Sequence, residues 1–171
     1  MGKRPGVRRR GRGGMQFRAA ATYKLKPAKY PSFSLDEERR GDIIDLVHES
    51  GRDVPLAKVR FEDGSVSFIP APLGTKVGQR MNFGLNSEII DGNVISIQNI
   101  PDGTIVCNVE QQFGDGGALM KSAGADATVF AHKDDGVILK LASGKFKKLN
   151  PKNRAMIGTL AGGGVEDRPL M

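Results

Sequence analysis

Three side chains in this sequence are of types that can perform covalent catalysis: Cys107, His48 and His132. Nucleophilic catalysis requires a nucleophile, a base and a group that orients the base. Cys107 lies within the apolar run TIVCNV, where alternation with a period of two places it with Ile105 and Val109, so we interpret it as a small core residue. Each histidine ends a predicted strand before a turn, where we expect it to face solvent or RNA. The three residues therefore do not predict an active site.

Metal and nucleotide sites are not predicted either. One cysteine and two distant histidines do not have the spacing of a zinc site. The run GDGG at 114–117 lacks the Lys and Ser/Thr of a P-loop, and AGGG at 161–164 does not open a predicted helix. We expect these glycines at turns with positive φ or where the backbone closely approaches a partner. The chain is thus expected to be no enzyme and to have no metal site or small-molecule substrate.

The strongest chemical signal is the charge of the first 35 residues. The chain has 171 residues and a net charge of +7, from 26 basic and 19 acidic side chains. Residues 1–35 hold ten basic side chains and no acidic one, which leaves the remaining residues with a balance of −3. Such a segment cannot bury enough apolar surface to fold alone. We therefore expect residues 1–35 to be a basic arm that only a polyanion orders.

The amino-acid composition distinguishes between two possible polyanions, an anionic membrane and nucleic acid. Gly11, Gly13 and Gly14 interrupt helix formation and no apolar stripe follows them, which disfavours a membrane-binding helix. The sequence also lacks the apolar stretch of a signal peptide and a membrane-spanning segment. Nucleic acid is then the favoured partner. The single cysteine is typical of a reducing, cytosolic compartment.

Aromatic side chains and a second basic segment accompany the arm. Arg18, Tyr23, Tyr30 and Phe33 either stack on unpaired bases or dock the arm onto the body. No basic residue lies between Arg80 and Lys121, whereas residues 136–165 contain six basic side chains and no acidic one. One side of the second half of the body should therefore be positive and bind phosphates.

The elements that position these residues are expected to be short strands. The segment LAKVRF has a period of two, with Ala57, Val59 and Phe61 on one face, and EDG turns it into SVSFI, which predicts a hairpin over 54–69. Further strands are expected at 42–48, 76–83, 104–110, 127–132, 137–142, KFKKL and 155–160, and a capping box of Ser34 and Glu37 precedes them. Many short strands with 23 glycines predict all-β barrels. We divide the chain into an arm and hinge at 1–41, a first barrel at 42–86 and a second at 87–171.

Several motifs together resemble a known family. They are RRGRGG with FRA, VPLAKVRFEDG, GNVISIQNIPDGTIVCNVE, GDGG, KLASGKFKKLNPKNRAMIGTLAGGG and DRPLM. Their order along the whole chain is similar to that of the universal ribosomal protein two of the large subunit, in its archaeal and eukaryotic form. Departures are local: family members commonly have RASG at 121–124, LPSG at 141–144, and a cysteine where Asn153 stands. Family members also continue past the position of Met171 with a His-Pro-His-Gly-Gly-Gly-like motif that this sequence does not contain, and whether Met171 is the biological end stays open.

The resemblance implies an OB-like barrel, then an SH3-like barrel and the start of the C-terminal extension, with the arm threaded into ribosomal RNA. It implies a cytoplasmic ribonucleoprotein role in translation: binding and stabilising large-subunit rRNA beside neighbouring ribosomal proteins, and supporting subunit association and the peptidyl transferase region. We expect no cofactor except Mg²⁺ that accompanies bound rRNA. The expected RNA-binding residues are Arg4, Arg8, Arg9, Arg10, Arg12, Arg18, Tyr23, Lys24, Lys26, Lys29, Lys121, His132, Lys145, Lys147, Lys148, Lys152, Arg154, Gly162, Gly163 and Gly164.

Two alternatives belong to other functional classes. One is a single-stranded RNA-binding OB-fold protein that acts outside the ribosome, which is compatible with the same charge pattern. The other is a small hydrolase, which would require His48, Cys107 and His132 to share one pocket.

Overall fold

The computed structural model confirms the predicted all-β class. It describes residues 2, 5, 7, 24–32, 37–84, 87–133, 135–164 and 167. Within these residues there is no α-helix; a 3-10 turn, η3 (Ile97–Asn99), follows the fifth strand, and ten strands form one sheet. The strands are β1 (Arg39–Val47), β2 (Leu56–Phe61), β3 (Val66–Pro70), β4 (Arg80–Phe83), β5 (Val94–Ser96), β6 (Ile105–Cys107), β7 (Ala127–Lys133), β8 (Gly136–Leu141), β9 (Phe146–Leu149) and β10 (Arg154–Ile157).

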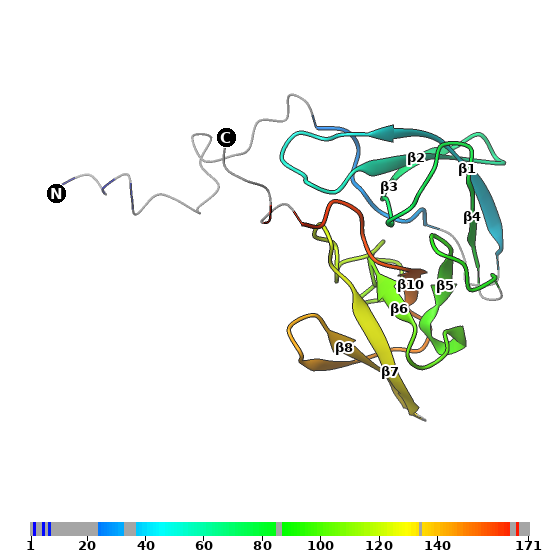
Figure 1. The fold of residues 1–171 in the computed structure, drawn as a ribbon, viewed down its shortest axis with the longest axis vertical. Helices are drawn as coiled ribbons and strands as arrows, with labels where there is room; N and C mark the ends of the chain where they lie inside the picture. The colour runs from blue at the N-terminus through cyan, green and yellow to red at the C-terminus, as the bar shows by residue number, and fades with distance from the viewer. Residues whose placement is uncertain are drawn as a thin grey trace.

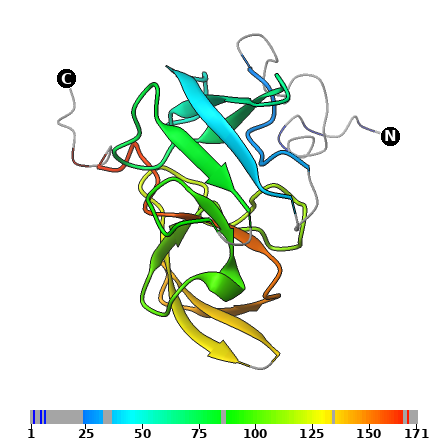
Figure 2. The ribbon, with the colours of Figure 1, turned by 90° about the vertical axis from the view of Figure 1, so that its right-hand side faces the viewer.

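The sheet runs in the order β3-β2-β1-β4-β5-β10-β6-β7-β8-β9. Its first four strands occupy one half of the molecule and the β7–β8 hairpin lies at the far end of the other half (Figure 1). Figure 2 shows the same separation from the side, with the β7–β8 hairpin at the end opposite to β1–β3. The two halves join where Phe83 of β4 pairs in parallel with Val94 of β5, a short strand that the sequence pattern did not predict.

The predicted hairpin is confirmed as β2 and β3. Ala57, Val59 and Phe61 are buried, whereas Lys58 on the other face is half-buried and Arg60 is exposed, as the period of two predicts. Leu56, at the start of β2 on the face of Lys58 and Arg60, departs from this pattern because it is also buried. The turn is closed by the backbone N–H of Gly64, which donates to the carbonyl of Phe61 at 2.9 Å. Gly64 has φ of +79°, a conformation that glycine adopts without strain.

Buried apolar side chains form two core clusters, one in each half. The first contains Ile43, Val59 and Phe83 from β1, β2 and β4, and the second contains Val129 and Leu139 from β7 and β8. The first cluster also takes four side chains from beyond residue 87: Val94, Cys107, Met156 and Leu160. The clusters therefore do not separate at one chain position, and the division at 86/87 stays a prediction.

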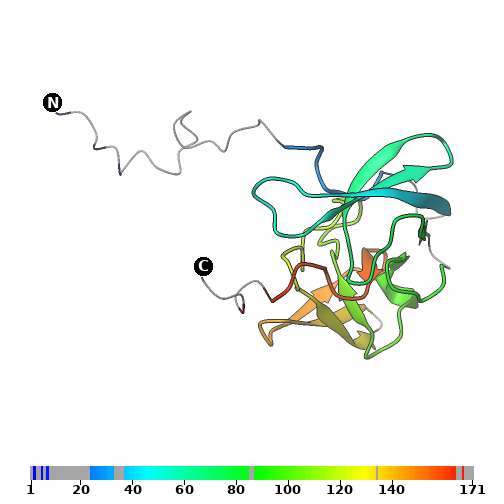
Figure 3. The same ribbon diagram turned by 45° about the horizontal axis from the view of Figure 1, so that its top comes forward.

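The segment after β10 returns from the second half to the first. The backbone N–H of Ala161 donates to the carbonyl of Ala71 at 3.0 Å, and Leu160 forms an isolated bridge with Pro72. In Figure 3 this orange-to-red segment lies between the two halves. It ties the end of the second half to the strands of the first.

Candidate nucleic-acid interface

Much of the basic arm lies outside the described residues. Among the residues outside the described part are Arg4, Arg8, Arg9, Arg10, Arg12, Arg18, Tyr23, the aromatic candidate Phe33, and Ser34, which begins the expected capping box. The arm segment 24–32 is described, and in it Lys24, Lys26 and Lys29 are exposed. These three lysines are accessible to a polyanion.

Tyr30 docks the arm segment on the body. Its ring is buried at 4% exposure and meets Phe83 edge-on, with 6.5 Å between the ring centroids. The hydroxyl donates to the carbonyl of Asn108 at 2.6 Å, and the backbone N–H donates to the carbonyl of Gly116 at 3.1 Å. Burial raises the pKa of Tyr30 well above 10.0, so the hydroxyl stays a donor. Of the two roles open for Tyr30, the structure assigns docking.

Glu49 provides a second attachment for the arm segment. Its carboxylate is buried, and it accepts a hydrogen bond from the backbone N–H of Leu25 at 2.9 Å and one from Nε of Arg52 at 2.5 Å. Burial by itself raises the pKa of Glu49, but the hydrogen bonds from Arg52 and Leu25 outweigh it and hold the pKa below 4.5. A buried negative charge thus holds the backbone of the arm.

Lys121, an expected RNA contact, is instead half-buried against the arm segment. Its Nζ donates to the carbonyls of Ala28 at 2.5 Å and Gly117 at 2.9 Å. Burial, and then the charges of Arg52 and Lys29, lower the pKa of Lys121. We call the group Leu25, Ala28, Tyr30, Glu49, Arg52, Lys121 and Arg154 the arm seam. Because Ala28 and Tyr30 are buried against the body and the N–H of Leu25 is bound by Glu49, contacts within the protein, and not a polyanion alone, hold this segment of the arm.

Arg154 requires a further correction. We expected it on the exposed surface, but it is 3% exposed and its guanidinium pairs with the fully buried carboxylate of Glu110, with 2.6 Å between Nη2 and Oε1. Nη1 also donates to the carbonyl of Pro31 at 3.3 Å, and the guanidinium lies over the rings of Tyr30 and Phe113. A buried charge must be paired in this way because its desolvation is costly. The charge of Arg154 is therefore used inside the protein.

The remaining basic side chains of residues 136–165 are accessible. We call them the second-barrel lysines: Lys140, Lys145, Lys147, Lys148 and Lys152. Lys147 is half-buried and the other four are exposed. Lys148 forms an ion pair with Asp135. The hydrogen bond from Lys148 is the main reason why the pKa of Asp135 is lowered. Four exposed lysines therefore lie on or next to the β8–β9 hairpin.

His132 and the glycines 162–164 have contacts within the chain. The ring of His132 lies 2.7 Å from Oδ1 of Asp102 and 3.3 Å from the carbonyl of Ile97. A Cβ on Gly162 would lie 2.8 Å from the carbonyl oxygen of Asp53, and one on Gly163 would lie 3.1 Å from Cα of Gly124. The close approach predicted for glycine thus occurs here between two segments of the chain. Asp53 and Asp167 line the hollow beside glycines 162–164, which does not favour phosphate.

The residues first considered for catalysis lie apart in the fold. Cys107 is buried, and burial raises the pKa of its thiol to about 12. Ile105, two residues earlier in β6, is 45% exposed, and Val109 packs in the second cluster whereas Cys107 packs in the first. The alternation ends after Cys107, because Asn108 has φ of +45°. His48 is exposed.

The described residues contain no group of three or more His, Cys, Asp or Glu that could hold a metal ion. In the same part of the chain, no helix is long and apolar enough to cross a membrane.

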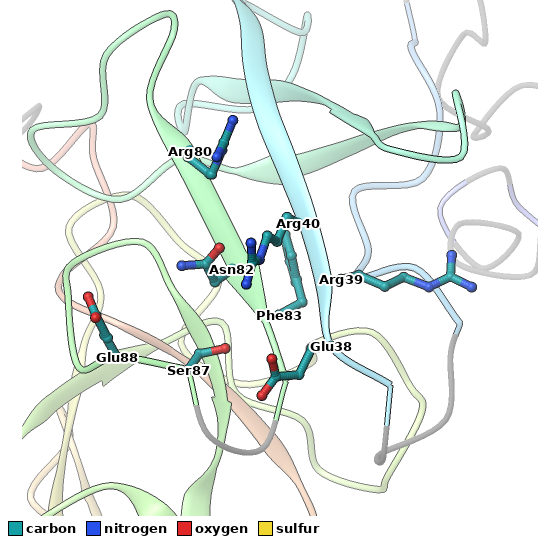
Figure 4. Close-up of a pocket in the computed structure, with 8 residues that line it drawn as sticks. All are labelled: Glu38, Arg39, Arg40, Arg80, Asn82, Phe83, Ser87 and Glu88. Carbon is teal, nitrogen blue, oxygen red and sulfur yellow. The ribbon is translucent and has the colours of Figure 1, made fainter.

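A pocket on the first half contains arginines that the sequence reasoning did not single out (Figure 4). It is lined by Glu38, Arg39, Arg40, Arg80, Asn82, Phe83, Ser87 and Glu88. In Figure 4, Arg40 lies beside Asn82, whereas Arg39 points away to the other side of β1. Arg80 pairs with Asp42 at 3.1 Å, and Arg39 pairs with Glu37 and Asp63. Since carboxylates surround these arginines, the pocket has mixed charge and is a weaker phosphate site than the second-barrel lysines.

Comparison with known proteins relates the chain to one protein family. The family described as "Ribosomal Proteins L2, C-terminal domain" matches residues 90–171. The "Large ribosomal subunit protein uL2" of Cenarchaeum symbiosum is 72% identical over 171 residues, which is all of this chain and 70% of the relative. The proteins of the same name from Nitrosopumilus maritimus and Korarchaeum cryptofilum are 71% and 44% identical, again over all of this chain and 70% of each relative.

Proposed function

Because the chain belongs to the family of the large ribosomal subunit protein uL2, in its archaeal type, we propose that it binds and stabilises large-subunit rRNA. Its membership makes it a structural constituent of the large ribosomal subunit in the cytoplasm, and not an enzyme. Membership also favours this role over that of a single-stranded RNA-binding protein outside the ribosome.

The observation that carries the proposal is the accessible charge of the second-barrel lysines. Four of the five are exposed, and no acidic residue occurs between 136 and 165 in the sequence. Lysines near phosphates release condensed counterions, which makes binding favourable at low salt. Exposed Lys24, Lys26 and Lys29 extend this charge along the arm segment.

The arm before residue 24 is proposed as a second rRNA contact. Its arginines Arg8, Arg9, Arg10 and Arg12 are close in sequence and interspersed with glycine, so they can follow phosphates along a groove. The seam holds the segment that follows this arm on the body. Leu25 is hydrogen-bonded to Glu49, and Tyr30 is hydrogen-bonded to Asn108. The arm would therefore leave the body from a defined position. Any Mg²⁺ would be bound by the rRNA and not by a site made of protein ligands.

By family resemblance, the wider role is to support subunit association and the peptidyl transferase region. We propose that the body contributes to this role as a scaffold bound to rRNA. Large subunits reconstituted with and without this chain, compared by sedimentation with small subunits, would test this role.

A salt titration tests rRNA binding directly. The arm variant replaces Arg8, Arg9, Arg10 and Arg12 by Gln, and the lysine variant replaces Lys140, Lys145 and Lys152 by Gln. Each lost phosphate contact should reduce the slope of log affinity against log salt by about 0.7 to 0.9. We expect both variants to bind large-subunit rRNA fragments more weakly and with a smaller slope than the parent chain.

The matched control is Lys76→Gln, which removes an exposed charge from the loop before β4. This control removes one positive charge away from the proposed contact surface. If local phosphate contacts matter, Lys76→Gln should change the slope of log affinity against log salt by less per charge than the lysine variant does. Parental slopes in both multiple variants would refute the proposal. A parent chain that fails to sediment with large subunits would do the same.

A further inference from the structure

The outer face of the β7–β9 sheet carries two phenyl rings that the core does not need. Phe130 and Phe146 are 56% and 57% exposed, and their rings meet edge to face with 4.9 Å between centroids. The inner face of the same strands is packed by buried residues that include Val129, Val137 and Leu139. Because folding buries that inner face, the exposed rings are available for a partner.

Strand register places lysines beside these rings. Lys140 of β8 is paired with Phe146 of β9 and with Thr128 of β7, so the three side chains point to the same side. Ile138 is paired with Lys148 two residues further along. We call this surface the aromatic-lysine face, made of Thr128, Phe130, Ile138, Lys140, Phe146 and Lys148.

Local geometry directs one ring toward the other. The register of β7 against β8 shifts between Val129 and Ala131, which marks a β-bulge at Phe130. A bulge increases strand twist and changes where a side chain points. The edge-to-face contact with Phe146 then holds both rings in place. The β7–β8 hairpin stands at one end of the molecule, where a large partner can reach it (Figure 2).

We propose that the aromatic-lysine face binds unpaired bases of large-subunit rRNA, which stack on Phe130 and Phe146 while Lys140 contacts the adjoining phosphate. This inference rests on the proposed rRNA-binding function and assigns to it a specific surface and a specific RNA structure. Stacking requires the face of a base, which is available in loops and single strands but not inside a duplex.

Charge complementarity favours RNA over an apolar protein partner on this face. Protein interfaces are enriched in aromatic residues but depleted in lysine, whereas single-strand RNA surfaces combine rings with positive charge. Lys140 and Lys148 border the two rings, and Lys145 lies in the adjoining turn. Asp135 pairs with Lys148 at the edge of the face, so Lys140 is the side chain assigned to the phosphate.

The test compares leucine, tyrosine and alanine at both ring positions in the full chain. Phe130→Leu with Phe146→Leu keeps apolar bulk but removes stacking. Stacking contributes about 1 to 3 kcal/mol per base, and about 1.4 kcal/mol corresponds to tenfold in affinity. The affinity for a single-stranded 12-nucleotide RNA and for loop-containing rRNA fragments should therefore fall about tenfold or more. The tyrosine variant should bind like the parent. The exposed-residue control, Leu73→Ala in the first half, should also bind like the parent.

Salt dependence separates this inference from the general rRNA-binding function. The leucine variant loses no charge, so its slope of log affinity against log salt should equal that of the parent. Parental affinity of the leucine variant, with the parent still showing its salt-dependent binding, overturns the stacking inference and leaves the proposed function standing. If leucine is tolerated and alanine is not, the face is an apolar contact and the inference is also overturned. A parent chain that binds no rRNA overturns both.

A measurement on the parent chain does not depend on the folding of any variant. With ¹³C-labelled phenylalanine, the ring signals of Phe130 and Phe146 should shift and show contacts to base protons when the 12-nucleotide RNA is added. The signals should stay unchanged on addition of the duplex formed by the same strand and its complement. Equal shifts with both RNAs, or with neither, contradict base stacking.

Discussion

Basic side chains in the arm seam and on the β8–β9 hairpin belong to the same residue types but have opposite roles. In the seam, Arg154 is buried beside Glu110 and Lys121 is held by two carbonyl oxygens. On the hairpin, Lys140 and Lys145 are exposed. The sequence places all of these residues after position 120, yet only the second group offers its charge to a partner.

This difference shows that a basic residue becomes a phosphate ligand only where the fold leaves it unburied. A paired charge inside the protein gives stability and position, but its field outside is largely cancelled by its partner. An exposed lysine contributes little to stability and adds directly to the attraction for polyanions. The seam and the hairpin should therefore respond in opposite ways to charge removal.

The largest expected effect is at the buried ion pair between Arg154 of the seam and Glu110. Glu110→Leu leaves the guanidinium of Arg154 buried without its carboxylate, which should lower the free energy of unfolding by about 3 to 5 kcal/mol. Urea denaturation measures it. The double variant Glu110→Leu with Arg154→Leu removes both charges and should be less destabilised than the single variant. If the loss in the double variant equals the sum of the losses in Glu110→Leu and Arg154→Leu measured separately, Glu110 and Arg154 are not coupled.

The next effect concerns Glu49, which holds the backbone of Leu25. Glu49→Gln weakens hydrogen bonds to a charged group and should cost about 1.5 to 3 kcal/mol. The folded pKa of Glu49 lies below the unfolded value of 4.5. Its contribution is therefore fully present above pH 4.5 and is lost as pH falls through the lower folded pKa. The parent chain should lose this stability in acid, whereas Glu49→Gln should show a flatter pH profile below 4.5. Identical profiles would contradict the attachment.

Much of the fold could be predicted because local patterns decide it. The alternation in LAKVRF and the EDG turn specify the β2–β3 hairpin without any information from distant residues. The β5 strand has only three residues and its partners are Phe83 of β4 and residues of β10, so no local signal identified it. The break at Asn108 was also missed, because positive φ in a non-glycine residue depends on its surroundings.

The candidate site was predicted less completely, since burial of charge is a tertiary property. Arg154 is in a run of basic residues, and only the position of Glu110, 44 residues earlier, shows that its charge is paired. Phe130 and Phe146 did have a usable signal: Phe130 alternates with the core residue Val129. That alternation predicts an outward ring, but the contact between the two rings required the strand pairing.

A smaller effect is expected at Cys107, which belongs to the core and not to the seam or the hairpin. Cys107→Ala removes a buried sulfur and should cost about 1 kcal/mol of stability, with rRNA affinity unchanged. With a pKa of about 12, the native thiol should also resist iodoacetamide at pH 8 and react only after unfolding. Rapid alkylation of the native protein, or weakened rRNA binding by a folded variant, would contradict a purely structural role.

The smallest expected change in stability is at Lys140. Its substitution is best compared with that of Lys121, because the two should have opposite effects on stability and on the salt dependence of rRNA binding. Lys140 is exposed on the outer face of β8, so Lys140→Gln should change the free energy of unfolding by less than about 0.5 kcal/mol. The same substitution should reduce the salt slope of rRNA binding by about 0.7 to 0.9. Lys121→Gln should do the reverse: it removes the ammonium that joins Ala28 to Gly117, at a cost of about 1 kcal/mol, and leaves the slope unchanged. Urea denaturation and salt titration of both variants measure the two quantities side by side. If Lys121→Gln flattens the slope as much as Lys140→Gln, the seam contributes charge to RNA binding and the distinction between the two regions fails.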